Sequence, residues 1–404
     1  MNRIAPWGTA GNWVRGCELD SVRQKVGSIL IASLLSIGRA EPADEQPRTN
    51  QQPVTTAAVV TGEAKRSSPA PLAPVYAMAL AGDLQEGLRI LESVPVETLN
   101  SSERTARENL LRTFVEKKLP PIAVPDPFVA ELIGIYRDYW MRVLLRELNV
   151  AEGKEYLFKR LTAILGQAGY HKQYHTLEKL SDEVGRILRR KGFYSLRGVT
   201  QPYYELMVWG KETARIYRVE LPETTIKVKV VFMRDFATLG WSAFATCGKA
   251  YSGGWARKDS LYCVADAYDP ASKSFAVSYL AHEAQHFADY RRFPKLEQPE
   301  LEYRAKLVEL ILANETARAV LTGFASQTGR SRSAPHNFAN LRLFTDVSRS
   351  ILGGDTPVTD PERWSGVSDQ DISRAARVLL ERNTKSLVAR GARQVSRVLE
   401  ESVP

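Results

Sequence analysis

The run His282-Glu283-Ala284-Gln285-His286 lies inside an apolar stretch with a helical period. Two histidines four residues apart on a helix share one face, so both imidazoles can bind the same zinc ion. Glu283 lies about 100° around the helix from His282, where its carboxylate can take a proton from a water on that metal. Because the chain has only five histidines in 404 residues, we interpret the run as a metal site rather than an ordinary helix face.

A catalytic zinc ion commonly takes three protein ligands and leaves one position for water. The segment Arg291-Arg292-Phe293-Pro294 ends the motif helix, and Gln298-Pro299 begins the next one. His286 is about 8 Å from the end of its helix, and an antiparallel partner helix should present its ligand at a similar depth. Glu302 meets this condition, whereas Glu315 would lie roughly 20 Å further along. The alternative for Glu302 is an acid that only complements the positive end of its helix.

Together with Glu302-Tyr303-Arg304-Ala305, the run resembles the gluzincin metallopeptidases, in which a glutamate from the next helix completes a His-His-Glu zinc site. The resemblance covers about residues 210–325. It implies an α+β, zincin-like core with a small mixed sheet, and a zinc ion held by His282, His286 and Glu302. It also implies peptide hydrolysis, in which zinc polarises the scissile carbonyl and Glu283 passes a proton to the leaving amine.

The residue at position 306 departs from this pattern, because many gluzincins have there an aspartate that buttresses a ligand histidine, and this chain has Lys306. Asp289 or Glu309 is the candidate for that contact. Asp289 also lies on the face of the two histidines, where the plainest interpretation is a surface acid in an ion pair.

A separate donor usually stabilises the oxyanion that forms during such a reaction. The candidates are His336, which follows Ala334-Pro335, and the tyrosines Tyr290 and Tyr303. We choose His336, for which the alternative is a histidine in a surface loop. The pair His171 and His175 repeats the four-residue spacing without a glutamate between, so we do not interpret it as a metal site.

The composition is that of an ordinary globular protein, with 44% hydrophobic and 25% charged residues and a net charge of +9. The charge permits association with an anionic envelope surface. We expect no nucleic-acid binding, because no basic block alternates with aromatic residues. The expected partner is a peptide or protein substrate, and the oligomeric state stays open.

Residues 1–40 have the order of a secretory signal, with Arg23 and Lys25 before an apolar stretch and small residues before position 41. We therefore expect a periplasmic or secreted protein, and an uncleaved membrane anchor is the alternative. Removal of the signal segment would take Cys17 with it and leave Cys247 and Cys263. In an oxidising compartment these two are a plausible disulfide, and two reduced thiols are the alternative.

Composition and hydrophobic period divide the rest of the chain into segments. Residues 41–74 are rich in Pro, Ala and Thr and predict a disordered linker, and residues 75–200 have a helical period. We assign residues 201–345 to the catalytic core. Alternation in 214–219 and 225–231 predicts two strands, and 261–265 a third that enters the motif helix. Residues 346–404 predict an arginine-rich helical tail packed on the body.

These observations predict an exported zinc metallopeptidase with an α+β core after a helical region. One alternative is a non-catalytic binding or scaffold protein of the cell envelope on a zincin-like frame. Another is a zinc hydrolase that acts on the peptide bridges of cell-wall polymer. Metal content and turnover separate the first alternative from an enzyme, and a substrate screen separates the second.

Overall fold

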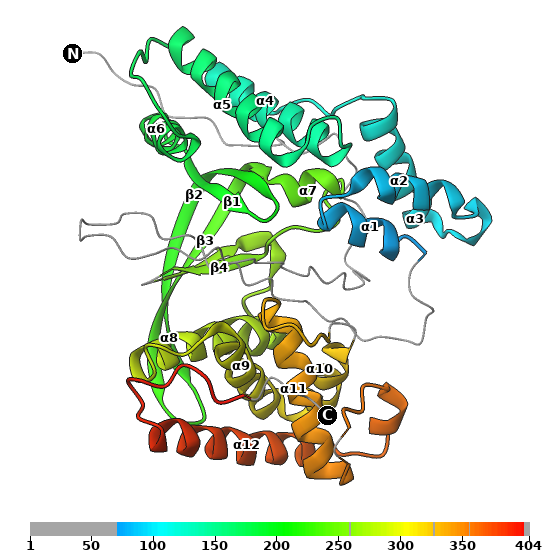
Figure 1. Cartoon of the computed structure of the whole chain (residues 1–404), viewed down its shortest axis with the longest axis vertical. Coiled ribbons are helices and arrows are strands. Elements are labelled where there is room, and N and C mark those ends of the chain that lie inside the picture. Colours follow the sequence, from blue (N-terminus) through cyan, green and yellow to red (C-terminus); the bar gives the residue numbers. More distant parts are fainter. Residues whose placement is uncertain (1–70, 258–259, 326–327, 355, 400–404) are drawn as a thin grey trace.

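The computed structural model describes residues 71–257, 260–325, 328–354 and 356–399. Helices come first along the chain, a sheet follows, and further helices complete the molecule (Figure 1). The predicted mixed α+β class, with a helical region before the sheet, is confirmed. The predicted signal segment and nearly all of the predicted linker lie outside the described residues.

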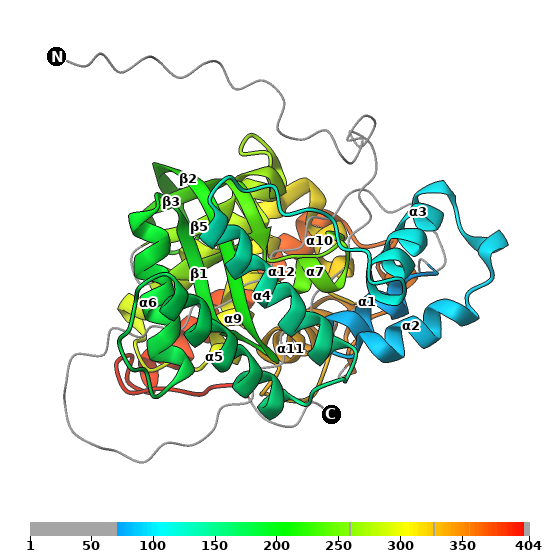
Figure 2. The same ribbon diagram turned by 90° about the horizontal axis from the view of Figure 1, so that it is seen from above.

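Five of the N-terminal helices start at a polar side chain that caps a free backbone N–H group. Asn100 and Asn149 each form a reciprocal capping box with the glutamate three residues later. Figure 2 shows that α4 to α6 lie over the strands, whereas α1 to α3 lie to one side. The bounds are α1 Ala73–Leu80, α2 Leu84–Ser93, η1 Val96–Thr98, α3 Ser101–Leu110, η2 Leu111–Val115, α4 Pro127–Leu144, α5 Val150–Gln167 and α6 Leu177–Arg190.

The described residues form one five-stranded sheet in the order β1-β2-β3-β5-β4. β3 and β5 run parallel, and the other neighbours are antiparallel. The two predicted strands at 214–219 and 225–231 are confirmed as parts of a longer hairpin, and the third predicted strand is β5. The bounds are β1 Tyr194–Thr200, β2 Tyr203–Glu220, β3 Thr225–Leu239, β4 Gly254–Arg257 and β5 Ser260–Val264.

Two large clusters of buried apolar side chains lie at opposite ends of the long β2–β3 hairpin. One joins the first six helices and α7 (Trp241–Ala245) to the beginning of β2. The other joins the far end of the hairpin and β5 to the C-terminal helices. The hairpin is therefore the element that connects the helical region to the part that carries the candidate site (Figure 1).

The C-terminal helices are organised around α9, which packs against α8, α10, α11 and α12. The predicted boundary at residue 345 falls inside α11, so the predicted core and tail share one helix. The predicted tail helix ends at Ala389, shortly before Gly391, whose φ is +90°. The bounds are η3 Ala265–Ala267, η4 Phe275–Ala281, α8 His282–Arg292, α9 Gln298–Ala313, η5 Asn314–Thr316, α10 Ala317–Gly323, α11 Pro335–Leu352, η7 Pro361–Trp364 and α12 Asp369–Ala389.

The predicted disulfide is wrong, because Cys247 and Cys263 are both free thiols. Cys247 follows α7 and packs against the helical cluster, with its Sγ 3.7 Å from Oγ1 of Thr113. Cys263 is on β5 and belongs to the other cluster. The two thiols thus pack into different cores. Among the described helices, none is long and apolar enough to cross a membrane.

Candidate metal site

The motif helix α8 continues directly from a π-helical segment, η4. Oγ of Ser272 accepts a hydrogen bond from the backbone N–H of Phe275, where η4 begins. The hydroxyl of Tyr279 then donates to the carbonyl oxygen of Tyr262 on β5 at 2.8 Å. The segment is thus tied to the sheet immediately before His282. π-Helical turns are rare and are found frequently at functional sites.

The three residues predicted as metal ligands lie together. Nε2 of His282 and Nε2 of His286 are 3.2 Å apart, on successive turns of α8. The carboxylate of Glu302 on α9 lies across from both, with one oxygen 3.4 Å from His282 Nε2 and the other 3.5 Å from His286 Nε2. One ligand atom from each residue can be chosen so that all lie within 4.8 Å of one another.

The donor set of this cluster fits zinc, which binds imidazole nitrogen and carboxylate oxygen and leaves a fourth position for water in catalytic sites. His282, His286 and Glu302 are only 2–4% exposed. Buried imidazole and carboxylate groups need partners, and a shared cation would supply one. Among the described residues, no other group of three histidine, cysteine or acidic side chains has this geometry.

Burial and the neighbouring charges decide the ionisation of the cluster. Burial lowers the pKa of His282, but the carboxylates of Glu309 and Glu302 outweigh that effect and raise this pKa to about 10. Burial raises the pKa of Glu302, but the imidazoles of His336, His286 and His282 outweigh it, so the pKa lies well below its ordinary value. The site therefore keeps Glu302 as a carboxylate, the form that binds a cation.

Glu309 supplies the buttressing contact for which two acids were candidates. Its Oε1 lies 2.6 Å from Nδ1 of His282, on the side of the ring opposite the cluster. Glu309 follows Glu302 by seven residues, about two helical turns, so both side chains leave α9 on the same face. Lys306 stands between them in the sequence, and its ammonium lies over the ring of Phe324. The carboxylate that holds His282 is thus at position 309 rather than 306.

Asp289 has a different role from the surface ion pair that the sequence suggested. It is 1% exposed, and both of its oxygens lie within 3.0 Å of Nε of Arg304 on α9. Arg304 also donates to Glu223 in the β2–β3 turn and to Asn383 and Thr384 on α12. This fully buried guanidinium therefore joins α8, α9, the hairpin and α12 behind the site.

Arg304 is a structural residue that the sequence alone did not single out. The helical period does indicate where Arg304 lies: it follows Glu302 by two residues and is therefore about 200° around α9 from it. A charged side chain on the face opposite a ligand had to find partners on another packed element. The sequence could not say which element that was.

Glu283, the predicted proton acceptor, is 1% exposed on the first turn of α8. Its charge is close to two tyrosines, Tyr268 and Tyr279. Their pKa values are raised well above the ordinary value, first by burial, then by Cys263 and then by Glu283. Glu283 is therefore buried beside two tyrosines, and its position next to His282 puts it about 100° around α8 from the two histidines.

His336, the predicted oxyanion donor, lies beside the cluster. It is in the first turn of α11 rather than in a surface loop, and its Nδ1 is 2.8 Å from Oε2 of Glu302. Its side chain is 23% exposed, more than any other member of the site. The structure therefore brings His336 to the third ligand, and its catalytic role stays a prediction.

The other candidates lie less favourably. The hydroxyl of Tyr303 is buried and donates to Asp346 at 2.8 Å, away from the histidines. Tyr290 is 37% exposed near the end of α8, where its hydroxyl accepts from Nε2 of Gln298 at 3.4 Å. His171 and His175 are exposed in a segment without helical structure.

The comparisons with known proteins add no relative. No protein-family model, no curated protein and no solved structure matches this chain.

Proposed function

We propose that the protein is a zinc-dependent peptidase with a gluzincin-like, zincin-type core. The observation that carries the proposal is the convergence of His282, His286 and Glu302, with Glu309 on the far nitrogen of His282. Ligands that are themselves held by a further carboxylate are typical of zinc sites. Export, a peptide or protein substrate and association with an anionic envelope surface belong to the same proposal and rest on the sequence.

The residues of the chain would divide the work as follows. His282, His286 and Glu302 hold the metal, which when bound polarises a carbonyl and lowers the pKa of water. Glu309 accepts a hydrogen bond from Nδ1–H of His282, so that Nε2 would present its lone pair to the metal once it gives up its own proton. Burial of these groups excludes competing water and strengthens the electrostatic attraction between them.

Glu283 is the proton acceptor of the proposed reaction. Its place next to His282 in sequence puts its carboxylate near the reacting centre without making it a ligand. The same carboxylate then returns the proton to the leaving amine. His336 would donate to the oxyanion, exchanging its contact with Glu302 for one with the substrate.

The proposal is tested by measuring zinc content and hydrolysis of a broad peptide library, including cell-wall peptide bridges, side by side. Glu283→Gln should retain wild-type zinc and lose turnover by about a hundredfold or more, because the variant keeps its shape but lacks the proton acceptor. His282→Ala/His286→Ala should lose both. Glu315→Gln, an exposed position outside the site, is the matched control and should change neither.

A second candidate, a non-catalytic scaffold, is favoured by one observation. His282, Glu283, His286 and Glu302 are each no more than 4% exposed, which suits a closed structural zinc site as well as a catalytic one. If the wild type binds one zinc, cleaves nothing in the library and is indistinguishable from Glu283→Gln, the scaffold is the better description. Stoichiometric zinc in the double-histidine variant would refute the metal site itself.

A further inference from the structure

The β2–β3 hairpin has an edge that no described strand covers. β1 pairs with β2 only over residues 203–209, whereas β3 pairs with β2 as far as Glu220 (Figure 1). Residues 211–220 of β2 therefore have a neighbouring strand on one side alone. Alternate residues of such a strand point their N–H and C=O groups away from the partner. Among the described residues, only those of β3 form hydrogen bonds with the backbone of 211–220.

This edge is open on both faces of the hairpin. Residues 213–216 are all exposed, and successive side chains on a strand point to opposite faces. Ile216 is 74% exposed, the most of any large apolar side chain in the part of the chain that the structure describes. Proteins usually shield a long strand edge, because its unpaired N–H and C=O groups invite another chain to pair with it.

Basic side chains surround Ile216 on its face of the hairpin. Lys229 is its cross-strand partner, and the next pair on that face is Arg218 with Lys227. Like charges opposite each other destabilise a sheet. Arg218 lies 3.7 Å from the exposed Glu220, and an exposed pair of this kind contributes little. Neither lysine makes an ion pair or a side-chain hydrogen bond with another described residue.

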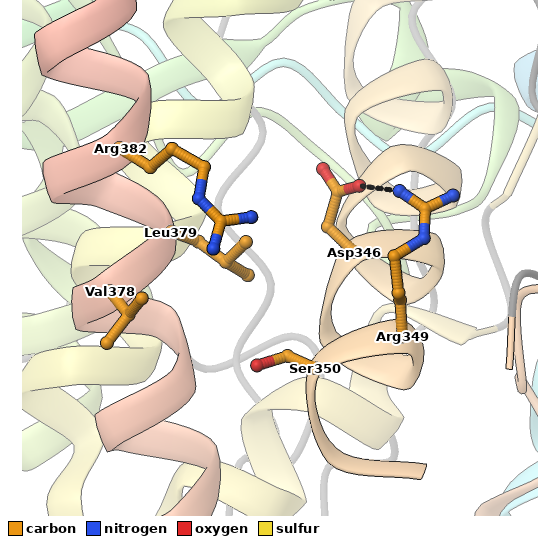
Figure 3. Close-up of a pocket in the computed structure, with 6 residues that line it drawn as sticks. All are labelled: Asp346, Arg349, Ser350, Val378, Leu379 and Arg382. Atoms are coloured by element: carbon orange, nitrogen blue, oxygen red, sulfur yellow. Dashed lines mark ion pairs between the residues drawn. The ribbon is translucent and has the colours of Figure 1, made fainter. Parts of the chain in front are cut away.

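Arginines of the C-terminal helices, by contrast, lie beside an acid. Figure 3 shows Arg349 paired with Asp346, and Arg382 extending toward the same carboxylate. On the hairpin, Glu212 already accepts a hydrogen bond from Nε1 of Trp209 at 3.0 Å. The positive charge on the outer face of the hairpin is thus not balanced by the acids that the structure places near it.

We propose that residues 211–220 of β2 are a docking site for an extended, acidic peptide segment of another protein, which would add to the sheet as a further strand. Main-chain hydrogen bonds to the free edge would supply the affinity. Acidic side chains of the segment would face Arg218, Lys227 and Lys229, which selects it over a basic segment.

A second copy of this chain is a less suitable partner. Two β2 edges paired with each other would bring two basic surfaces together, because residues 211–220 and 227–229 of each copy carry five basic and two acidic side chains. The proposed docking needs neither zinc nor Glu283. It therefore goes beyond the proposed function and can be tested with inactive protein.

The test uses the full chain with Glu283→Gln, so that no peptide is cleaved, at low ionic strength. The probe is a fluorescein-labelled peptide of alternating glutamate and valine, about eight residues long like an ordinary strand, and binding is measured by fluorescence anisotropy. One comparison peptide has lysine in place of glutamate. Another has proline in place of valine, which keeps the charge but prevents strand pairing. Only the glutamate–valine peptide should bind.

Arg218→Glu/Lys229→Glu should weaken this binding roughly tenfold or more, because two attractions become repulsions. Arg377→Glu/Lys385→Glu makes the same change of charge at exposed positions on α12 and is the matched control. Circular dichroism checks that each variant is folded. Binding that is lost in the first variant and kept in the second supports the site.

Three results would overturn the proposal: no binding of the glutamate–valine peptide, equal binding of the proline peptide, or equal losses in the two double variants. Vesicles that contain anionic lipid are tested alongside. If they bind through Arg218 and Lys229 and the peptide does not, the partner is a membrane surface and the peptide site is refuted.

Discussion

His282 has a different partner at each of its ring nitrogens. Nδ1 lies 2.6 Å from Glu309, and Nε2 faces Glu302 and His286. A histidine whose far nitrogen is bound to a carboxylate has its tautomer and its ring orientation fixed, which raises its basicity as a ligand. Glu309, seven residues after Glu302 on α9, therefore fixes the ring orientation of His282, a candidate metal ligand.

Glu309→Ala should weaken zinc binding by about 10- to 100-fold, as is usual when the partner of a ligand histidine is removed. Affinity is measured by competition with a chromophoric chelator, and folding by circular dichroism. Glu315→Ala, an exposed glutamate just beyond α9, is the control and should bind zinc normally. Equal affinity of Glu309→Ala and wild type would show that the 2.6 Å contact does not support the site.

At the scale of elements, Glu205 joins β2 to α7. Its buried carboxylate accepts from the backbone N–H groups of Leu206 at 2.9 Å and Trp241 at 3.0 Å, and from the hydroxyl of Thr200 at 2.9 Å. Gly240, with φ of +93°, allows this approach, since a Cβ there would lie 2.2 Å from Oε1 of Glu205. Burial is the larger effect and raises the pKa of Glu205 to about 7.

The raised pKa predicts a loss of stability with rising pH. The unfolded chain titrates Glu205 near 4.5 and the folded protein near 7, so the folded state binds the proton more tightly between these values. The contribution of Glu205 to the free energy of unfolding is most favourable below pH 4.5 and falls between pH 4.5 and 7. Above this window the buried, ionised carboxylate costs about 3 kcal/mol. Glu205→Gln should reduce the fall in unfolding free energy between pH 5 and 8.

Denaturant unfolding at pH 5 and pH 8 measures this difference. Glu220→Gln, an exposed position on the same strand, is the control and should follow wild type. A pH dependence that is the same in all three proteins would mean that Glu205 does not titrate in this range.

At the scale of the molecule, the chain after α12 returns to the beginning of α9. The backbone N–H of Glu297 donates to the carbonyl of Ser396 at 3.0 Å, and Oε1 of Glu300 accepts from the backbone N–H of Leu399 at 3.4 Å. Val395 packs into a small apolar cluster with Phe293, Leu296, Leu301 and Leu387. The connection between the two helices of the metal site is thus covered by the last described residues.

Val395→Asp should lower the free energy of unfolding by about 3 kcal/mol, because it places a carboxylate in an apolar cluster without a partner. It should also weaken zinc binding, since the covered turn sets the spacing between α8 and α9. Arg393→Asp introduces the same residue at an exposed position two residues earlier and serves as the control. Equal stability of the two variants in denaturant unfolding would show that the tail does not hold this turn.

Much of the candidate site could be predicted because its information is local. The period of α8 places His282 and His286 on one face, and helix lengths alone put Glu302 rather than Glu315 opposite them. The alternation in 214–219 and 225–231 likewise gave the hairpin. Each of these features depends on the geometry of one element or of two successive elements.

The tertiary structure decided the contacts between elements that are far apart in the sequence, because no helix or strand period predicts such contacts. Glu309 rather than Asp289 contacts His282, because Asp289 is paired with Arg304. The position of Arg304 in turn depends on its hydrogen bond to Thr384 on α12. The thiols of Cys247 and Cys263 pack into different cores, although a short loop suggested a bond. Helix and strand periods specify which face a side chain is on, and only the packed chain specifies what that face meets.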